Sequence, residues 1–113
     1  MKKIEAIIRP EKLPVVKAAL EETGYPGMTV TEVKGHGVQK GVVQQWRGRQ
    51  FTVEFLPKVK VEVVVVSDAD VDRILTLIHE NASTGEIGDG KVFVTEIAET
   101  MRVRTGERGE AAV

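Results

Sequence analysis

The segment from Gly85 to Lys91 has the residue types of an anion-binding loop, with three glycines and a lysine within a few positions. Glycines let backbone N–H groups close around an oxyanion, and a lysine adds a positive charge. The spacing matches the phosphate-binding pattern G-x-x-x-x-G-K except at its last position, where Val92 replaces the Ser or Thr that holds Mg²⁺. A helix is expected before this loop and a strand after it, the reverse of a P-loop. We therefore reject a P-loop nucleotide hydrolase and keep two interpretations, an anion cradle and a plain tight turn.

Other glycines and cations could join this loop in one anion site. Gly35 and Gly37 follow a predicted strand, Lys58 lies on the next strand, and Arg102 and Arg104 alternate in the C-terminal segment. If the chain is extended there, both guanidinium groups project to one side. Each charge-assisted hydrogen bond to a phosphate would contribute about 1.5–3 kcal/mol. The alternative is that both arginines are solvated side chains of a charged tail.

The sequence offers little for catalysis. It has no cysteine, which excludes thiol catalysis, disulfide scaffolds and Cys-ligated metals. Of its two histidines, His79 fits the polar face of a helix and His36 could contact a ligand, but neither has a visible acid–base partner. We expect no catalytic residue and no enzyme activity.

Length and charge narrow the class of protein further. The 113 residues are 42% hydrophobic, which is enough for one domain spanning residues 1–113. The net charge of −1 offers no field for nucleic acid or an anionic membrane, and the predicted central strand has valines, Lys60 and Glu62 where an RNA-binding domain needs aromatic side chains. Charges interrupt the N-terminus, and no apolar run approaches the ~18 residues of a membrane span. We expect a soluble, cytoplasmic protein.

Hydrophobic periodicity predicts six elements that position these groups. Alternating residues indicate strands at 2–9, 28–34, 52–66 and 91–97, and apolar residues at helical spacing indicate helices at 11–23 and from the Ser67 cap to Ala82. The order β-α-β-β-α-β is typical of the ferredoxin-like split βαβ fold, an α+β fold with both helices on one face of an antiparallel sheet.

The connection between the second and third strands is unusually long. It runs from Gly35 to Phe51 and contains the only tryptophan, Trp46, where two to five residues would be usual. Two interpretations stay open, an ordered hairpin extension with Trp46 packed on it and a mobile arm that binds a partner.

Five segments carry a resemblance to a known family, the PII nitrogen-regulatory signal-transduction proteins, over essentially the whole chain: residues 2–10, 27–35, 55–60, 84–93 and 102–107. The resemblance implies a homotrimer of ferredoxin-like protomers with ATP or ADP in three clefts between subunits. It also implies that Mg²⁺-ATP binds together with 2-oxoglutarate. The long loop, called the T-loop, would dock on an ammonium transporter or a nitrogen-metabolism enzyme, and any membrane association would occur only through that transporter. The alternative is a PII-like nucleotide-binding regulator of a different transporter or enzyme.

The resemblance also implies a role for individual residues. Gln39 would ligate the Mg²⁺ that the oxo acid chelates, which fits the preference of Mg²⁺ for a few protein oxygen ligands. Lys58 and Arg9 would pair with the far carboxylate of the oxo acid. The nucleotide contacts would be Thr29 near the adenine, Gly35, Gly37 and Val38 along the base of the loop, Gly88, Asp89, Gly90 and Lys91 around the phosphates, and Arg102 and Arg104 from a neighbouring subunit.

Three positions depart from the family pattern. Phe51 stands where many members carry a Tyr that is uridylylated or adenylylated, and without a hydroxyl this modification is chemically impossible. Arg49 replaces the Ser that is phosphorylated in cyanobacterial relatives. Val38 stands where an Arg is common, which removes one phosphate contact. Arg47, in contrast, matches the loop-tip Arg that enters the transporter pore.

Overall fold

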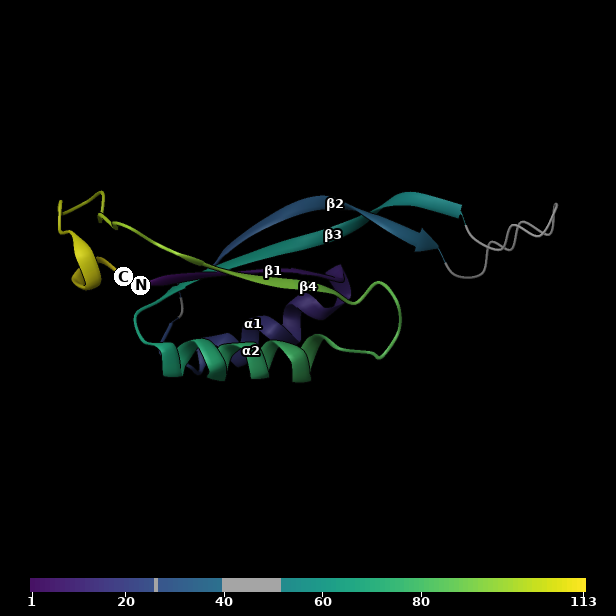
Figure 1. Cartoon of the computed structure of the whole chain (residues 1–113), viewed down its shortest axis with the longest axis horizontal. Coiled ribbons are helices and arrows are strands. Elements are labelled where there is room, and N and C mark those ends of the chain that lie inside the picture. The colour runs from purple at the N-terminus through teal and green to yellow at the C-terminus, as the bar shows by residue number, and fades with distance from the viewer. Residues whose placement is uncertain (26, 40–51) are drawn as a thin grey trace.

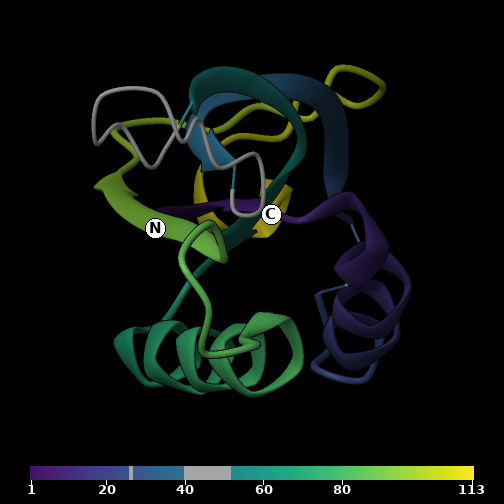
Figure 2. The same cartoon turned by 90° about the vertical axis from the view of Figure 1, so that its right-hand side faces the viewer.

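The computed structural model describes residues 1–25, 27–39 and 52–113, with backbone alone at 38, 39, 52 and 53. Four strands form one antiparallel sheet in the order β2-β3-β1-β4, and both helices lie against the same face of it (Figures 1 and 2). The predicted ferredoxin-like α+β fold and its element order are therefore confirmed. In chain order the elements are β1 (Lys2–Ile8), a 3-10 turn (Pro10–Lys12), α1 (Leu13–Glu21), β2 (Thr29–Gln39), β3 (Thr52–Val65), α2 (Asp68–Ala82), β4 (Gly90–Glu96) and a C-terminal 3-10 turn (Gly109–Ala112).

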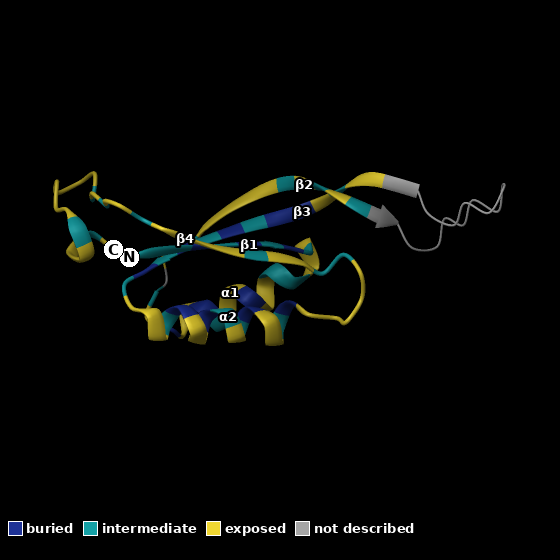
Figure 3. Cartoon of the chain, viewed as in Figure 1, coloured by how far each residue is buried: buried dark blue, intermediate teal, exposed yellow. Residues whose placement is uncertain are grey.

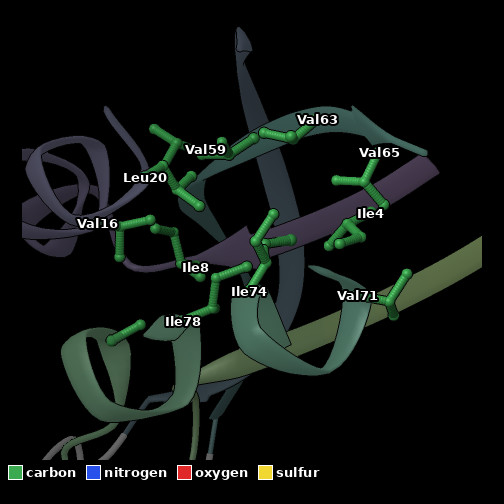
Figure 4. Packing of buried hydrophobic residues seen from close by; sticks show 13 residues of the cluster. Ile4, Ile8, Val16, Leu20, Val59, Val63, Val65, Val71, Ile74 and Ile78 are labelled. Atoms are coloured by element: carbon green, nitrogen blue, oxygen red, sulfur yellow. The ribbon is translucent and has the colours of Figure 1, made fainter. Parts of the chain in front are cut away.

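The core lies between the sheet and the two helices (Figures 3 and 4). Alternate residues of β1 and β3 point into it because side chains of a strand face opposite sides in turn. Helix residues at the predicted spacing, such as Leu20 and Ile74, fill the space below them. The buried hydrophobic residues are Ile4, Ala6, Ile8, Val16, Leu20, Val59, Val61, Val63, Val65, Val71, Ile74, Ile78 and Ala82.

The cap predicted at Ser67 is confirmed. The Ser67 hydroxyl accepts a hydrogen bond from the backbone N–H of Asp70 at 3.2 Å, which satisfies one of the unpaired donors at the start of α2. The Asp70 carboxylate accepts a hydrogen bond from the Tyr25 hydroxyl. This contact joins the turn after α1 to the start of α2.

Most predicted strand limits are correct to within a residue, but β2 is longer than expected. It continues beyond Lys34 through the glycines to Gln39, so the prediction that it ends abruptly at Gly35 is wrong. The reason is that side chains of β3 pack against the two glycines. A Cβ at Gly35 would lie 3.0 Å from the Cγ of Lys58, and one at Gly37 would lie 2.9 Å from Cδ1 of Leu56. Side chains of β3 therefore fill the space that the glycines leave, and the hairpin extends past β1 and β4 (Figure 1).

The sheet face away from the helices carries charged side chains that alternate with the buried ones. Lys3 pairs with Glu62 at 3.3 Å, and Lys60 lies 3.8 Å from both Glu5 and Glu62. Neither helix covers this face. In the described part of the chain, no helix is long and apolar enough to cross a membrane.

Candidate functional site

A cavity of about 800 Å³ opens where the end of β1, the root of the β2–β3 hairpin and the loop before β4 meet. Most of its lining comes from residues that the sequence had singled out, although they are far apart along the chain. Apolar side chains of Ile7, Leu56 and Phe93 form the rest of its wall, together with Glu86, Ile87 and His36. The predicted site residues that line the cavity are Arg9, Gly35, Gly37, Lys58, Gly88, Gly90 and Lys91.

The loop at residues 84–90, here called the cradle, is shaped by the carboxylate of Asp89. One oxygen accepts from the Thr84 hydroxyl at 2.5 Å and from Nε of Arg9 at 3.1 Å. The other accepts from the backbone N–H groups of Thr84 at 2.8 Å and Gly85 at 2.9 Å. The hydrogen bonds from Thr84, followed by those from Arg9 and Gly85, hold the pKa of Asp89 far below its usual value.

This network changes the interpretation of Asp89. Its side chain is occupied within the cradle and does not line the cavity. A carboxylate that stays ionised would also repel an anionic ligand. The contact to phosphate predicted at this position stays a prediction, and it would have to come from the backbone N–H rather than the carboxylate.

The glycines of the cradle are required by its geometry. Gly88 and Gly90 have φ of +99° and +111°, which side chains rarely tolerate. A Cβ at Gly90 would lie only 1.8 Å from the carbonyl oxygen of Ile7 on the neighbouring strand. Gly90 therefore lets β4 begin its pairing with β1 directly beside the cavity.

Two cations lie beneath the cradle. Nη2 of Arg9 donates to the carbonyl of Ile87 at 3.0 Å, and the Lys58 ammonium donates to the carbonyl of Gly88. Lys58 is only 8% exposed, and burial, together with the positive charge of Arg9, lowers its pKa. An anion that enters the cavity would offset this unfavourable burial of charge, so the site is suited to a carboxylate or phosphate.

Other predicted site residues lie away from this cavity. Thr29 begins β2 opposite Glu62, six residues before Gly35, which corresponds to about 20 Å along a strand. Arg102 and Arg104 follow β4 at the opposite end of the sheet from the cradle (Figure 1). One chain therefore does not bring these three residues to its own cavity.

The backbone around Arg102 and Arg104 is not the extended chain assumed from the sequence. A backbone hydrogen bond from Gly106 N–H to the Arg102 carbonyl, 2.8 Å long, closes a turn that includes Arg104. The extended backbone assumed at Arg104 is therefore wrong, and a common side for the two guanidinium groups stays a prediction without that support. A turn breaks the period-two pattern on which it rested.

Several predicted residues fall outside what the structure describes. The side chains of Val38 and Gln39 are not described, although their backbone ends β2. Trp46, Arg47, Arg49 and Phe51 lie in the segment 40–51, which is also outside the described residues. Their roles stay predictions, as do both interpretations of the long loop. His79 is exposed on α2, as predicted.

Thr84 and Ile7 are among the contributors to this site that sequence reasoning missed. Thr84 holds Asp89 through both its hydroxyl and its N–H, and Ile7 supplies an apolar wall beside Lys91, its partner in the sheet. The sequence did hint at a role for Ile7. It is an apolar residue on the face of β1 opposite the core, where an alternating pattern predicts a polar residue. Thr84 gave no such hint, because the carboxylate that it binds is five residues away in an irregular loop.

The chain is similar to known proteins over its whole length. The profile of the family described as "Nitrogen regulatory protein P-II" matches residues 1–107. Over all 113 residues the chain is 57% identical to the "Nitrogen regulatory protein P-II" of Rhodospirillum rubrum and 55% identical to the "Nitrogen regulatory protein P-II 1" of Escherichia coli, and covers each completely. It is also 54% identical to the "Nitrogen regulatory protein P-II 2" of Methanothermobacter thermautotrophicus, of which it covers 97%. With this similarity over its full length, the chain belongs to the P-II family of nitrogen regulatory proteins.

Proposed function

We propose that the chain is a metabolite sensor that binds ATP or ADP and, with Mg²⁺-ATP, 2-oxoglutarate, and that it regulates an ammonium transporter or a nitrogen-metabolism enzyme through residues 35–51. P-II proteins are regulatory proteins rather than enzymes, which agrees with a binding role. The observation that carries the proposal is the cavity itself, because it joins a buried lysine, a half-buried arginine, glycine backbone and an apolar wall in one place.

The cradle supports phosphate binding. Its shape is already fixed by the Thr84–Asp89 hydrogen bonds, so the glycine N–H groups need little rearrangement to meet an oxyanion. Lys91 lies next in the chain, lines the cavity and is exposed. Nucleotide phosphates would bind here, with the apolar wall against the ribose or base.

The root of the hairpin supports binding of the oxo acid. Lys58 offers a desolvated ammonium group beside Arg9, which suits the far carboxylate of 2-oxoglutarate. Gln39 would supply one oxygen to Mg²⁺, whose charge would link the nucleotide to the oxo acid. ADP lacks the third phosphate and should support oxo-acid binding poorly.

The distance of Thr29, Arg102 and Arg104 from the cavity supports a site shared between chains. If neighbouring copies supply these residues, each of the three sites of a homotrimer contains groups from two chains. The sheet face left open by the helices, with its alternating Lys and Glu residues, offers polar and charged contacts for such an assembly. Nucleotide should then stabilise the oligomer.

A titration with mixed subunits tests this proposal. Lys91→Ala and Arg104→Ala should each weaken ADP binding about 10- to 100-fold, since each removes a charge-assisted contact. When the two variants are unfolded and refolded together, mixed trimers should regain some sites of wild-type affinity. In such a site the Arg104→Ala chain supplies an intact Lys91, and the neighbouring Lys91→Ala chain supplies an intact Arg104. Lys17→Ala on the outer side of α1 is the matched control. Absence of ADP and ATP binding in the wild-type protein would refute the proposal, and absence of rescue would refute the shared site.

The loop requires a separate test. Trp46 is the only tryptophan, so its fluorescence reports on the loop without labelling. The signal should change when 2-oxoglutarate joins Mg²⁺-ATP, Gln39→Ala should abolish the change, and Arg47→Ala should leave ligand binding intact while preventing transporter binding. Oxo-acid binding that persists in Gln39→Ala without Mg²⁺ would contradict this mechanism.

A further inference from the structure

The tail after β4 folds into a small hairpin held by local contacts. Met101 and Arg108 form a β-bridge, and the Arg102 N–H donates to the carbonyl of Glu107 at 2.8 Å. Gly106 adopts a φ of +74° in the turn between them. The 3-10 turn Gly109–Ala112 follows directly, anchored by a hydrogen bond from Gly109 N–H to the Thr100 carbonyl at 2.9 Å.

The two arginines of this tail are held differently. Nη1 of Arg102 donates to Oε1 of Glu107 at 3.2 Å, and its Nη2 donates to the carbonyl of Ala111, also at 3.2 Å. Its guanidinium group therefore connects the hairpin to the C-terminal turn. Arg104 is exposed, and within residues 1–25, 27–39 and 52–113 the structure gives its side chain no hydrogen bond or ion pair.

These contacts order the Arg102 side chain before any ligand binds, and this affects how it binds an anion. A surface arginine samples many rotamers, and an anion that binds it must restrict them. The contacts to Glu107 and Ala111 already impose that restriction. A guanidinium group has five N–H donors, so three remain available for a phosphate after these two bonds.

We propose that Glu107, with the carbonyl of Ala111, is a positioning residue that holds Arg102 in the orientation that binds nucleotide phosphate on a neighbouring chain. This inference rests on the proposed nucleotide site. The negative charge of Glu107 acts in the opposite direction, since it repels phosphate. The side chains of the pair are 39% and 45% exposed, so solvent and salt screen this repulsion, and the gain from orientation prevails.

The test compares two carboxylates of the same tail. Glu107→Ala should weaken ADP binding about three- to tenfold, the range expected when one long side chain must be ordered on binding. Glu107→Gln keeps a neutral acceptor and should lose less. The control is Glu99→Ala, which breaks the 2.8 Å pair with Arg108 at similar exposure but does not touch Arg102, and it should bind ADP like the wild type. Thermal unfolding without nucleotide should be the same for Glu107→Ala and Glu99→Ala.

A double-mutant cycle separates positioning from general damage to the tail. In an Arg102→Ala background, Glu107→Ala should cause no further loss, whereas in an Arg104→Ala background it should cause its full loss. A chain ending at Glu110 lacks the Ala111 carbonyl and should also bind ADP several-fold more weakly. Unchanged or tighter binding by Glu107→Ala, or an equal loss in both backgrounds, would overturn the inference. Wild-type protein that does not bind ADP would instead mean that the proposed function itself has failed.

Discussion

The cradle at residues 84–90 and the tail at residues 97–113 both present groups suited to anions, but different contacts hold them. Arg9 supports the cradle through bonds to Asp89 and Ile87, about 80 residues away in sequence. The ion pairs of the tail, such as Arg102–Glu107 and Arg108–Glu99, join residues fewer than ten positions apart. The cradle therefore combines local hydrogen bonds between Thr84 and Asp89 with long-range bonds from Arg9, which follows β1. Ile97 and Thr100 bond to Met1, but from Met101 onward the tail is held by local contacts, and it lies too far away to complete the cavity of its own chain.

The largest expected effect comes from placing a side chain where the cradle meets the sheet. Gly90→Ala would bring a Cβ to 1.8 Å from the Ile7 carbonyl at a φ of +111°, so strand pairing at the start of β4 must give way. We expect a loss of about 3 kcal/mol or more in the free energy of unfolding, measured with urea.

Gly85→Ala is the matched control for this substitution. Gly85 has a φ of +83°, but no atom lies within 4 Å of the added Cβ. Only the backbone strain of about 1–2 kcal/mol should appear. Equal losses at both positions would show that the close approach of the strands is not what requires Gly90.

Effects of intermediate size on stability and ADP affinity should separate the roles of Arg9 and Arg104. Arg9→Ala removes hydrogen bonds to Asp89 and Ile87, and should lower both the free energy of unfolding, by about 1.5–3 kcal/mol, and the affinity for ADP. Arg104→Ala should lower ADP affinity alone, because the residue has no described contact to lose. Denaturation and calorimetric titration of both variants make the comparison. If Arg104→Ala also destabilises the ligand-free protein, the tail contributes more to the fold than its local contacts indicate.

The smallest effect should be a difference in stability that disappears in acid. The pKa of Asp89 lies well below its ordinary value of 3.8, so its ionised form stabilises the folded state. That contribution is complete above about pH 4 and is lost as the pH falls through the lower pKa of the folded state. Asp89→Asn removes the titrating group, so the urea midpoints of the two proteins should differ at pH 6 and converge below pH 4. Other carboxylates with lowered pKa, Asp68 and Asp70, titrate in both proteins and cancel. A difference that stays constant with pH would show that the charge of Asp89 does not support the cradle.

Local sequence patterns determined the fold of this protein to a large extent. The alternating valines of β3, the helical stripe of Ile74 and Ile78, and the Ser67 cap each depend on neighbours within a few residues, and all three are found as predicted. The glycines and Lys91 around the start of β4 likewise marked this loop, as either an anion cradle or a tight turn. Family motifs spread over the whole chain then connected these elements to the P-II proteins.

Only the tertiary structure decided what each polar group does. The Asp89 carboxylate holds Thr84 and Arg9, and Lys58, which the sequence marked as a site cation, is buried beneath Gly88. The length of β2 depended on β3 side chains that lie across its glycines, and the arginines of the tail proved to lie at the far end of the sheet. Periodicity reports which face of an element a residue occupies. The partner that it meets there is set by contacts between distant parts of the chain, which local spacing does not encode.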